Sequence, residues 1–213
     1  MSDFNISDTD ERVFLLNNLE LLTAIFRGPD SEGWTAIIST GLPELMARST
    51  HGGADLTHSL NNLQEALPTS SKIPDGLSDL ETEYVRLFVA GRGGIVAPLY
   101  ESCHLGDAPR IMGDAALSMQ SRLNECGLEV SLESNEPPDH LSLELEYIYH
   151  LLVTGWSDNK PELENKAQEF AKLEMLPWLR RFRDALNNGE PHPAYSTSAD
   201  LAIDVLKMIS GKR

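Results

Sequence analysis

The chain has 213 residues, enough to bury a substantial core in one large domain or two small ones without metals or disulfides. Its 33 acidic residues outnumber its 17 basic residues, so the formal net charge is −16. This excess argues against nucleic acid and anionic lipid as partners, because both require clustered Lys and Arg. It suits a basic partner such as an arginine-rich peptide, although acidity that only maintains solubility is the simpler explanation.

Cellular location can be inferred from the cysteines and the N-terminus. Cys103 and Cys126 form no CxxC motif, which fits a reducing compartment and indicates no metal finger. The opening stretch MSDFNISDTDERVF lacks the basic and apolar regions of a secretory signal. No apolar run approaches the roughly 18 residues of a membrane-spanning helix. We therefore expect a cytoplasmic protein with no stable membrane insertion.

Apolar residues follow helical spacing along almost the whole chain. Ser7 and Asp10 suit a capping box at the start of the first helix, and Gly28 follows its end. In chain order, helices are expected at about 10–26, 34–41, 43–46, 56–67, 77–88, 107–123, 139–153, 160–187 and 196–209. The segment 160–187 is either one long helix or two joined near Pro177.

The connections between these helices are rich in helix-breaking residues. TSSKIPDG (69–76) is predicted to be a connection, GRGGIVAP (91–98) an exposed loop, and Gly127 the end of a helix. No stretch alternates apolar and polar residues well enough to predict a strand. The pattern therefore predicts an all-α, single-domain bundle of roughly nine or more helices over residues 1–213, with a possible hinge at 69–76 and a loop at 127–138.

A first unusual group lies between residues 81 and 106. Tyr84 and Phe88 share a helix face, and a glycine loop follows that runs into PLYES (98–102). The glycines follow a helix, and no Lys-Ser/Thr comes after them, so neither a P-loop nor a dinucleotide motif fits. The loop is interpreted as flexible rather than phosphate-binding.

A second group is PPDHLSLELEYI (137–148). Asp139 is expected to be the N-cap of a helix on which His140 and Glu144, four residues apart, share a face. Capping and the helix dipole explain these residues without a metal. The alternative is a metal-assisted hydrolase that uses His104, Asp139, His140 and Glu144, although this spacing alone supplies only two ligands.

A third group is LPWLRRF (176–182), in which Trp178 follows a proline. Aromatic and aliphatic residues at helical spacing usually form core, but Trp178 is also a candidate lining residue for a groove. Motifs of the main hydrolase classes, G-x-S-x-G and H-E-x-x-H, are absent from the sequence.

These groups occur together and in one order, and in this the chain resembles the TorD/DmsD/NarJ family of cytoplasmic redox-enzyme maturation chaperones. The resemblance spans roughly residues 10–210. The stretches that carry it are E-x2-Y-x2-LF (81–88), PLYES (98–102), PPDHLSLELEYI (137–148), LPWLRRF (176–182) and HPAYSTSADLA (192–202). PLYES followed by PPDHL is the most specific of them.

The resemblance implies an all-helical chaperone, not an enzyme, that needs no cofactor. Its partner would be the catalytic subunit of a molybdopterin-dependent oxidoreductase, bound through a twin-arginine leader or a comparable N-terminal segment and held until its cofactor is inserted. The peptide contacts implied by the family motifs are Tyr84, Leu87, Phe88, Pro98, Tyr100, Glu101, Pro138, Asp139, His140, Glu144 and Trp178. The chain departs from the family pattern at His104 and Glu174, where an aromatic residue and a histidine are common.

The chemistry of such a leader agrees with these residues. Its arginines require carboxylates, which Glu101, Asp139 and Glu144 can supply, and its apolar stretch requires an aliphatic and aromatic groove.

A structural subunit of a respiratory complex is a third hypothesis. The identity of the client stays open, as does the choice between a monomer and a dimer that swaps helices at 69–76 or 127–138.

Overall fold

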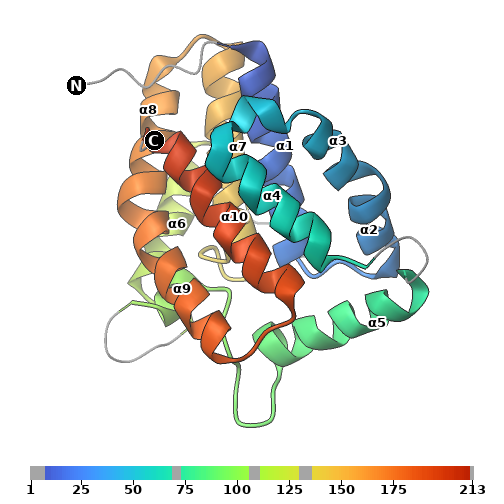
Figure 1. Ribbon diagram of the computed structural model, residues 1–213. Helices are drawn as coiled ribbons and strands as arrows, with labels where there is room; N and C mark the ends of the chain where they lie inside the picture. The colour runs from blue at the N-terminus through green and yellow to red at the C-terminus, as the bar shows by residue number, and fades with distance from the viewer. Residues whose placement is uncertain (1–7, 69–72, 106–110, 130–135, 212–213) are drawn as a thin grey trace.

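The computed structural model describes residues 8–68, 73–105, 111–129 and 136–211. Within these ranges the chain is all-α, as the periodicity predicts, and has no β-sheet (Figure 1). The α-helices are α1 (Thr9–Phe26), α2 (Ser31–Ala36), α3 (Leu42–Ala47), α4 (Gly53–Ala66), α5 (Ile73–Tyr84), α6 (Asp114–Glu125), α7 (Leu141–Ser157), α8 (Pro161–Phe170), α9 (Leu176–Asn188) and α10 (Pro193–Ile209).

The core lies between two pairs of long helices. α1 packs along α7, and α10 packs along α4, with α8 and α9 closing one side of the bundle (Figure 1). The apolar stripe of α1 is fully buried at Phe14, Leu22 and Phe26 because it faces this interior. Among the described residues, one cluster of buried apolar side chains includes residues from every α-helix. α5 contributes Leu77 and Leu80 to it.

In the described part of the chain, three π-helical turns extend the helices. Ile37–Gly41 joins α2 to α3, Val85–Val89 follows α5, and Ala171–Met175 joins α8 to α9. Residues 161–188 are therefore one continuous helical run, and Pro177 lies in the first turn of α9 rather than at a break. The π-helical turn Ala171–Met175 directly precedes this proline, and such turns occur where the regular hydrogen-bond ladder of a helix is interrupted.

The structure corrects two predicted boundaries. α5 begins at Ile73, so residues 73–76 of the expected connection are helical, and residues 69–72 lie outside the described residues. The helix expected to open at Asp107 begins at Asp114, with Gly113 as its N-cap. Residues 106–110 are not described, and Met112 adopts a positive φ of 62°, which an α-helix does not allow.

The start of α1 differs in detail from the predicted capping box. Asp8 is the N-cap, and its carboxylate accepts a hydrogen bond from the backbone N–H of Asp10. Ser7 lies outside the described residues. None of the described helices combines the length and apolar character that crossing a membrane requires.

Candidate functional site

The structure brings PLYES and PPDHL together, although the 34 residues from 103 to 136 separate them in the chain. The backbone N–H of Glu101 donates to the carbonyl of Asp139 at 3.0 Å, and the N–H of Leu141 donates to the carbonyl of Leu99 at 2.8 Å. These bonds form an isolated antiparallel bridge between Tyr100 and His140, whose rings meet edge to face at 5.3 Å. The two family-like motifs therefore form one structural unit at the start of α7.

Asp139 is not the N-cap of α7, contrary to the prediction. His140 occupies that position with an extended backbone, and its Nδ1 accepts a hydrogen bond from the N–H of Ser142. Asp139 instead accepts a 2.9 Å hydrogen bond through Oδ2 from the N–H of Ser102. The carboxylate therefore caps the 3-10 turn Glu101–Cys103 on the neighbouring segment, and it links the two motifs.

His140 is held neutral by this arrangement. Burial lowers its pKa, although the nearby carboxylates of Glu136 and Asp139 oppose the shift. Because Nδ1 accepts from a backbone N–H, the single proton of the neutral ring lies on Nε2.

Glu144 and Trp178 are completely buried behind this unit. The indole Nε1–H of Trp178 donates to Glu144 Oε2 at 3.0 Å. His104 stacks on the indole with 5.6 Å between ring centroids, and its Nε2 lies 2.7 Å from the carbonyl oxygen of Pro98. A carbonyl can only accept, so this nitrogen carries the proton of His104, whose pKa is lowered by burial.

Glu101 and Glu144 form an interacting pair of buried carboxyl groups. Burial raises the pKa of Glu101, which is only 7% exposed, to about 7. Burial also raises the pKa of Glu144 well above its ordinary value, and the charge of Glu101 adds to that shift. Two ionised carboxylates would repel each other in this interior, so the pair retains protons well above the usual range for glutamate.

The aromatic residues of the first group belong mostly to the core. Leu87 is fully buried, and its carbonyl accepts hydrogen bonds from the N–H groups of Val96 and Ala97 at 3.1 Å. Phe88 stacks on Phe182 at 6.1 Å. Tyr84 is half-buried, and its hydroxyl donates to the carbonyl of Phe26 at 3.0 Å.

The predicted contact residues therefore differ in accessibility. Tyr84, Pro98 and Tyr100 are half-buried and present atoms at the surface, where the Tyr100 hydroxyl donates to Glu136 at 2.7 Å. The remaining predicted contacts are buried in this conformation: Leu87, Phe88, Glu101, Pro138, Asp139, His140, Glu144 and Trp178. These buried residues position the accessible ones.

Sequence reasoning missed a cleft that Glu101 helps to line. The cleft has a volume of about 220 Å³ and is lined in part by Arg122 on α6, Phe170 on α8 and Glu174. Arg122 pairs with Glu174 at 2.9 Å across 52 positions of sequence. No local pattern predicts a pair this far apart, although Glu174 stands out as a departure from the family-like motif.

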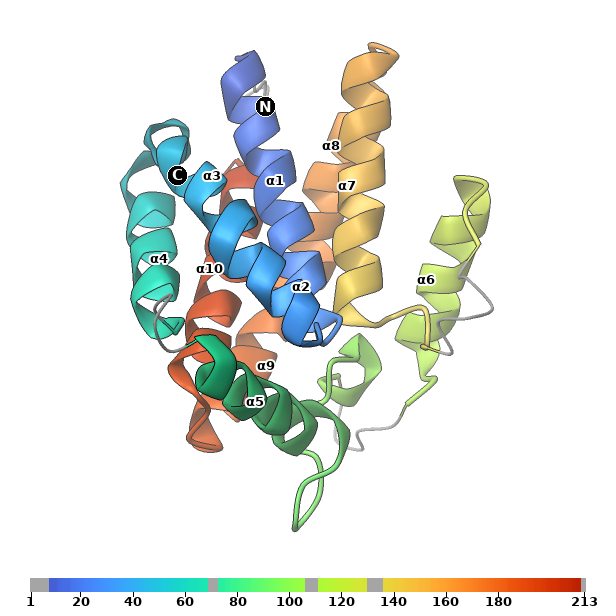
Figure 2. The ribbon, with the colours of Figure 1, turned by 90° about the vertical axis from the view of Figure 1, so that its right-hand side faces the viewer.

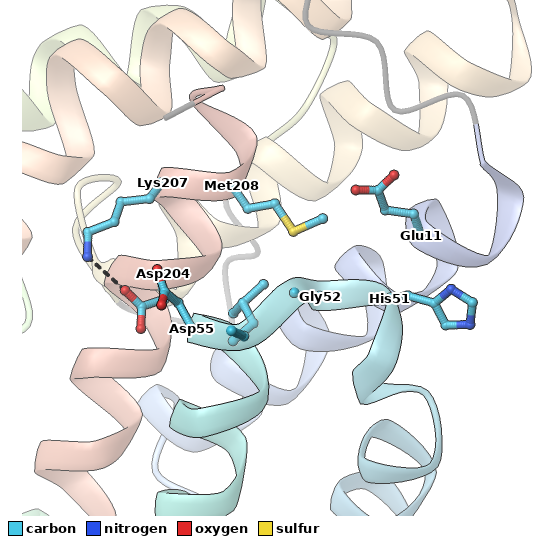
Figure 3. Close-up of a pocket in the computed structure, with 10 residues that line it drawn as sticks. Glu11, His51, Gly52, Asp55, Asp204, Lys207 and Met208 are labelled. Atoms are coloured by element: carbon cyan, nitrogen blue, oxygen red, sulfur yellow. Dashed lines mark hydrogen bonds and ion pairs between the residues drawn. The ribbon is translucent and has the colours of Figure 1, made fainter. Parts of the chain in front are cut away.

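A larger cavity of about 420 Å³ lies elsewhere, where the N-terminus of α4 meets α1 and the last turns of α10 (Figure 3). Gly52, Asp55, Asp204 and Lys207 line it, and Lys207 is paired with Asp204. None of the predicted contact residues lines this cavity.

The arrangement does not favour the metal-assisted hydrolase. Among the described residues, no three or more His, Cys, Asp and Glu side chains are grouped so that they could hold a metal ion. His104 and Asp139 are engaged with backbone groups, at Pro98 and Ser102 respectively.

Comparison with known proteins connects this geometry to a family. The sequence model of the family described as "Nitrate reductase delta subunit" matches residues 52–184, more than half of the chain. The chain is 26% identical over 157 residues to "Chaperone protein TorD" of Vibrio cholerae serotype O1 (strain ATCC 39541 / Classical Ogawa 395 / O395), covering 70% of this chain and 68% of the relative. It is 23% identical over 192 residues to "Chaperone protein TorD" of Salmonella arizonae, covering 90% and 87%.

A solved structure from Archaeoglobus fulgidus, provisionally named a redox enzyme maturation protein, has the same fold. The TM-score is 0.52 at 20% sequence identity, and the alignment covers 87% of this chain and 90% of that one. The match to the family model spans the PLYES and PPDHL unit together with the Trp178 that packs behind it. The chain therefore belongs to the nitrate reductase delta subunit family.

Proposed function

We propose that this protein binds the twin-arginine leader, or a comparable N-terminal segment, of a molybdopterin-dependent oxidoreductase catalytic subunit in the cytoplasm. It holds that subunit until the cofactor is inserted, before export or assembly. The family assignment carries the general role: the chain is a maturation chaperone for a molybdoenzyme and not a catalyst. That the protein binds its client through the leader is a separate part of the proposal, and it is tested separately.

The contact surface that we propose is built on the unit of PLYES and PPDHL. Tyr84, Pro98 and Tyr100 are its accessible members. Three exposed apolar residues lie close to them in the chain, Val85 and Val89 after α5 and Ile95 on the projecting loop. Together they offer an apolar and aromatic surface of the kind that an amphipathic peptide requires. The buried carboxyl of Asp139 fixes the turn next to Tyr100 through its bond with the N–H of Ser102.

The proposal is tested by calorimetry with the leader peptides of molybdoenzymes encoded in the same genome. We expect a leader with two arginines to bind, and the same leader with both arginines replaced by lysine to bind more weakly, because lysine cannot form the bidentate contact with a carboxylate. Absence of binding to every such leader would refute the proposal. Light scattering of the same samples distinguishes a monomer from a helix-swapped dimer.

A further inference from the structure

The cleft beside Glu101 has the composition of a guanidinium site. It lies between the segment Glu101–Leu105, α6 and the run from α8 to α9, and α6 stands at the edge of the bundle (Figure 2). Arg122 reaches into it, pairs with Glu174 at 2.9 Å, and places its guanidinium over the ring of Phe170 at 5.2 Å. A carboxylate and an aromatic face are the two partners that proteins use to bind an arginine side chain.

The cleft holds more negative charge than Arg122 can balance. Three carboxyl groups line it, those of Glu101, Asp114 and Glu174, while Arg122 is its one lining cation among the described residues. Glu101 interacts with both neighbours: the charge of Glu174 raises its pKa and that of Arg122 lowers it. The cleft is therefore suited to bind a second guanidinium, or to bind in place of Arg122 a cation that makes more contacts.

Exposed apolar residues gather on the same segments. The described chain exposes eight large apolar side chains, and five of them lie on or beside the segments that form the cleft: Leu105, Ile111, Met112, Leu117 and Leu173. Leu117, on α6 itself, is 64% exposed. Apolar side chains next to an acidic cleft match a ligand with a cationic group beside a hydrophobic stretch.

We propose that this acidic cleft binds an arginine side chain of the leader peptide, that Arg122 is an internal occupant which the incoming guanidinium displaces from Glu174, and that the exposed apolar residues around α6 contact the peptide residues next to that arginine. The inference rests on the proposed function and adds the place where an arginine is recognised. Displacement is feasible because the pair of Arg122 and Glu174 is partly exposed, and such pairs contribute little to stability. An internal competitor also favours peptides that add apolar contacts over isolated arginines.

Binding of a fluorescent leader peptide with two arginines, measured by anisotropy at pH 8, tests the proposal. We expect Glu174→Gln and Glu101→Gln each to weaken binding by about fivefold or more, since each removes a carboxylate from the site. Glu169→Gln makes the same change of charge on the exposed face of α8 and should alter the affinity by less than about twofold.

Substitution of Arg122 distinguishes displacement of its guanidinium from a direct contact with the peptide. Arg122→Gln should tighten binding several-fold, because the competing guanidinium is gone. Lys166→Gln is the matched control, because Lys166 also links α8 to α6, through Glu125 at 3.0 Å, but does not line the cleft. Circular dichroism confirms that each variant is folded.

The outcomes separate this inference from the proposed function. If the leader binds the wild type and the Glu174 and Glu101 variants equally, the cleft is not the arginine site and the proposed function stands. Weaker binding to Arg122→Gln would show that Arg122 contacts the peptide rather than competes with it, which overturns the displacement. If no leader binds the wild type, the proposed function and the inference both fail.

Discussion

At the scale of single residues, Asp139 stabilises a turn that lies 37 positions earlier in the chain. Its carboxylate is fully buried and accepts from the N–H of Ser102, while its other oxygen has no hydrogen-bond partner among the described residues. Burying a carboxylate costs free energy unless it receives hydrogen bonds. The bond to Ser102 is therefore the main local reason for an aspartate at this position, and it holds Tyr100 beside His140.

Asp139→Ala should lower the free energy of unfolding by about 2 kcal/mol, because it leaves the N–H of Ser102 buried without an acceptor. Urea denaturation measures this. Asp184→Ala is the control, since Asp184 is exposed and its ion pair is with the neighbouring Arg183, and should change the value by less than about 0.5 kcal/mol. Equal effects of the two substitutions would contradict the role assigned to Asp139.

Gly28 shows a close approach that only glycine allows. Its φ is +77°, and a Cβ atom there would lie 2.6 Å from a ring carbon of Tyr84. Gly127 also has a positive φ, of +69°, but open space around it. Both glycines adopt a positive φ, which other residues rarely adopt. Of the two, only Gly28 lies so close to Tyr84, a predicted peptide contact, that an added Cβ atom would collide with its ring.

Gly28→Ala should therefore destabilise the protein more than Gly127→Ala. The positive φ alone costs about 1–2 kcal/mol in either variant, and displacement of the Tyr84 ring adds to the cost at Gly28. Thermal unfolding of both variants measures the difference. A similar fall in Tm for the two would show that Tyr84 moves away without loss.

At the scale of elements, the sequence predicts helices well and their ends less well. The stripe from Phe14 to Phe26 is found as α1, because a long apolar face must be buried whatever its neighbours are. Ends depend on local competition: His140 rather than Asp139 caps α7, since a partner for Asp139 comes from another segment. The π-helical turns have no sequence signal of their own.

The sequence predicts the arrangement of the candidate site only in part, because its geometry, like the ends of the helices, depends on partners from distant segments. The family resemblance implies that Tyr100 and His140 contact the same peptide, and the structure places their rings together. Accessibility depends on how all helices pack, so the complete burial of Glu144 and Trp178 could not be inferred from their neighbours in sequence. The same holds for the pair of Arg122 and Glu174, which long-range packing creates.

α6 should be less protected against exchange than α10. It buries only Ala116, Met119 and Leu123, whereas α10 buries residues along its whole length. Local stability follows the number of buried apolar contacts, so amides of α6 should exchange with deuterium faster than those of α10. Mass spectrometry of peptic fragments measures this, and equal protection in the two helices would contradict it. Protection of α6 that rises when the leader is added would support the acidic cleft.

The contact between the turn Glu101–Cys103 and α7 should make stability depend on pH. The pKa of Glu101 is about 7 in the folded protein and that of Glu144 is also raised, so the folded state binds more protons than the unfolded state above about pH 4.5. Stability contributed by this pair is therefore full below about pH 4.5 and is lost as the pH rises through about 7. Burial lowers the pKa of His104 and His140, which acts in the opposite direction near pH 6.

Comparison of the wild type with Glu101→Gln isolates the carboxyl pair. Urea denaturation at pH 5 and pH 8 should show the wild type losing more stability over this interval than the variant, by roughly 2 kcal/mol. The histidines contribute equally to both proteins and cancel in the difference. Parallel curves for the two proteins would mean that the Glu101 carboxyl titrates normally.

At the scale of the whole molecule, charge and shape serve different steps of the proposed binding. A net charge of −16 acts over a distance and does not distinguish one cation from another. Recognition of arginine requires short contacts, such as those that Glu174 and Phe170 make with Arg122. The association rate of the leader should therefore depend on the charge of the whole chain, and its dissociation rate on a few contact residues.

This separation predicts how salt and peptide chemistry affect the rates. Raising NaCl from 50 to 500 mM should lower the association rate constant of a leader with two arginines by about tenfold, because the screening length falls below the distance over which the acidic surface acts. A leader with two lysines carries the same charge, so its association should show the same salt dependence while its dissociation is faster. Stopped-flow fluorescence measures both rates. An association rate that salt does not change would show that the acidity of the chain serves solubility alone. A lysine leader that dissociates as slowly as the arginine leader would exclude guanidinium recognition, both at the unit of PLYES and PPDHL and at the acidic cleft.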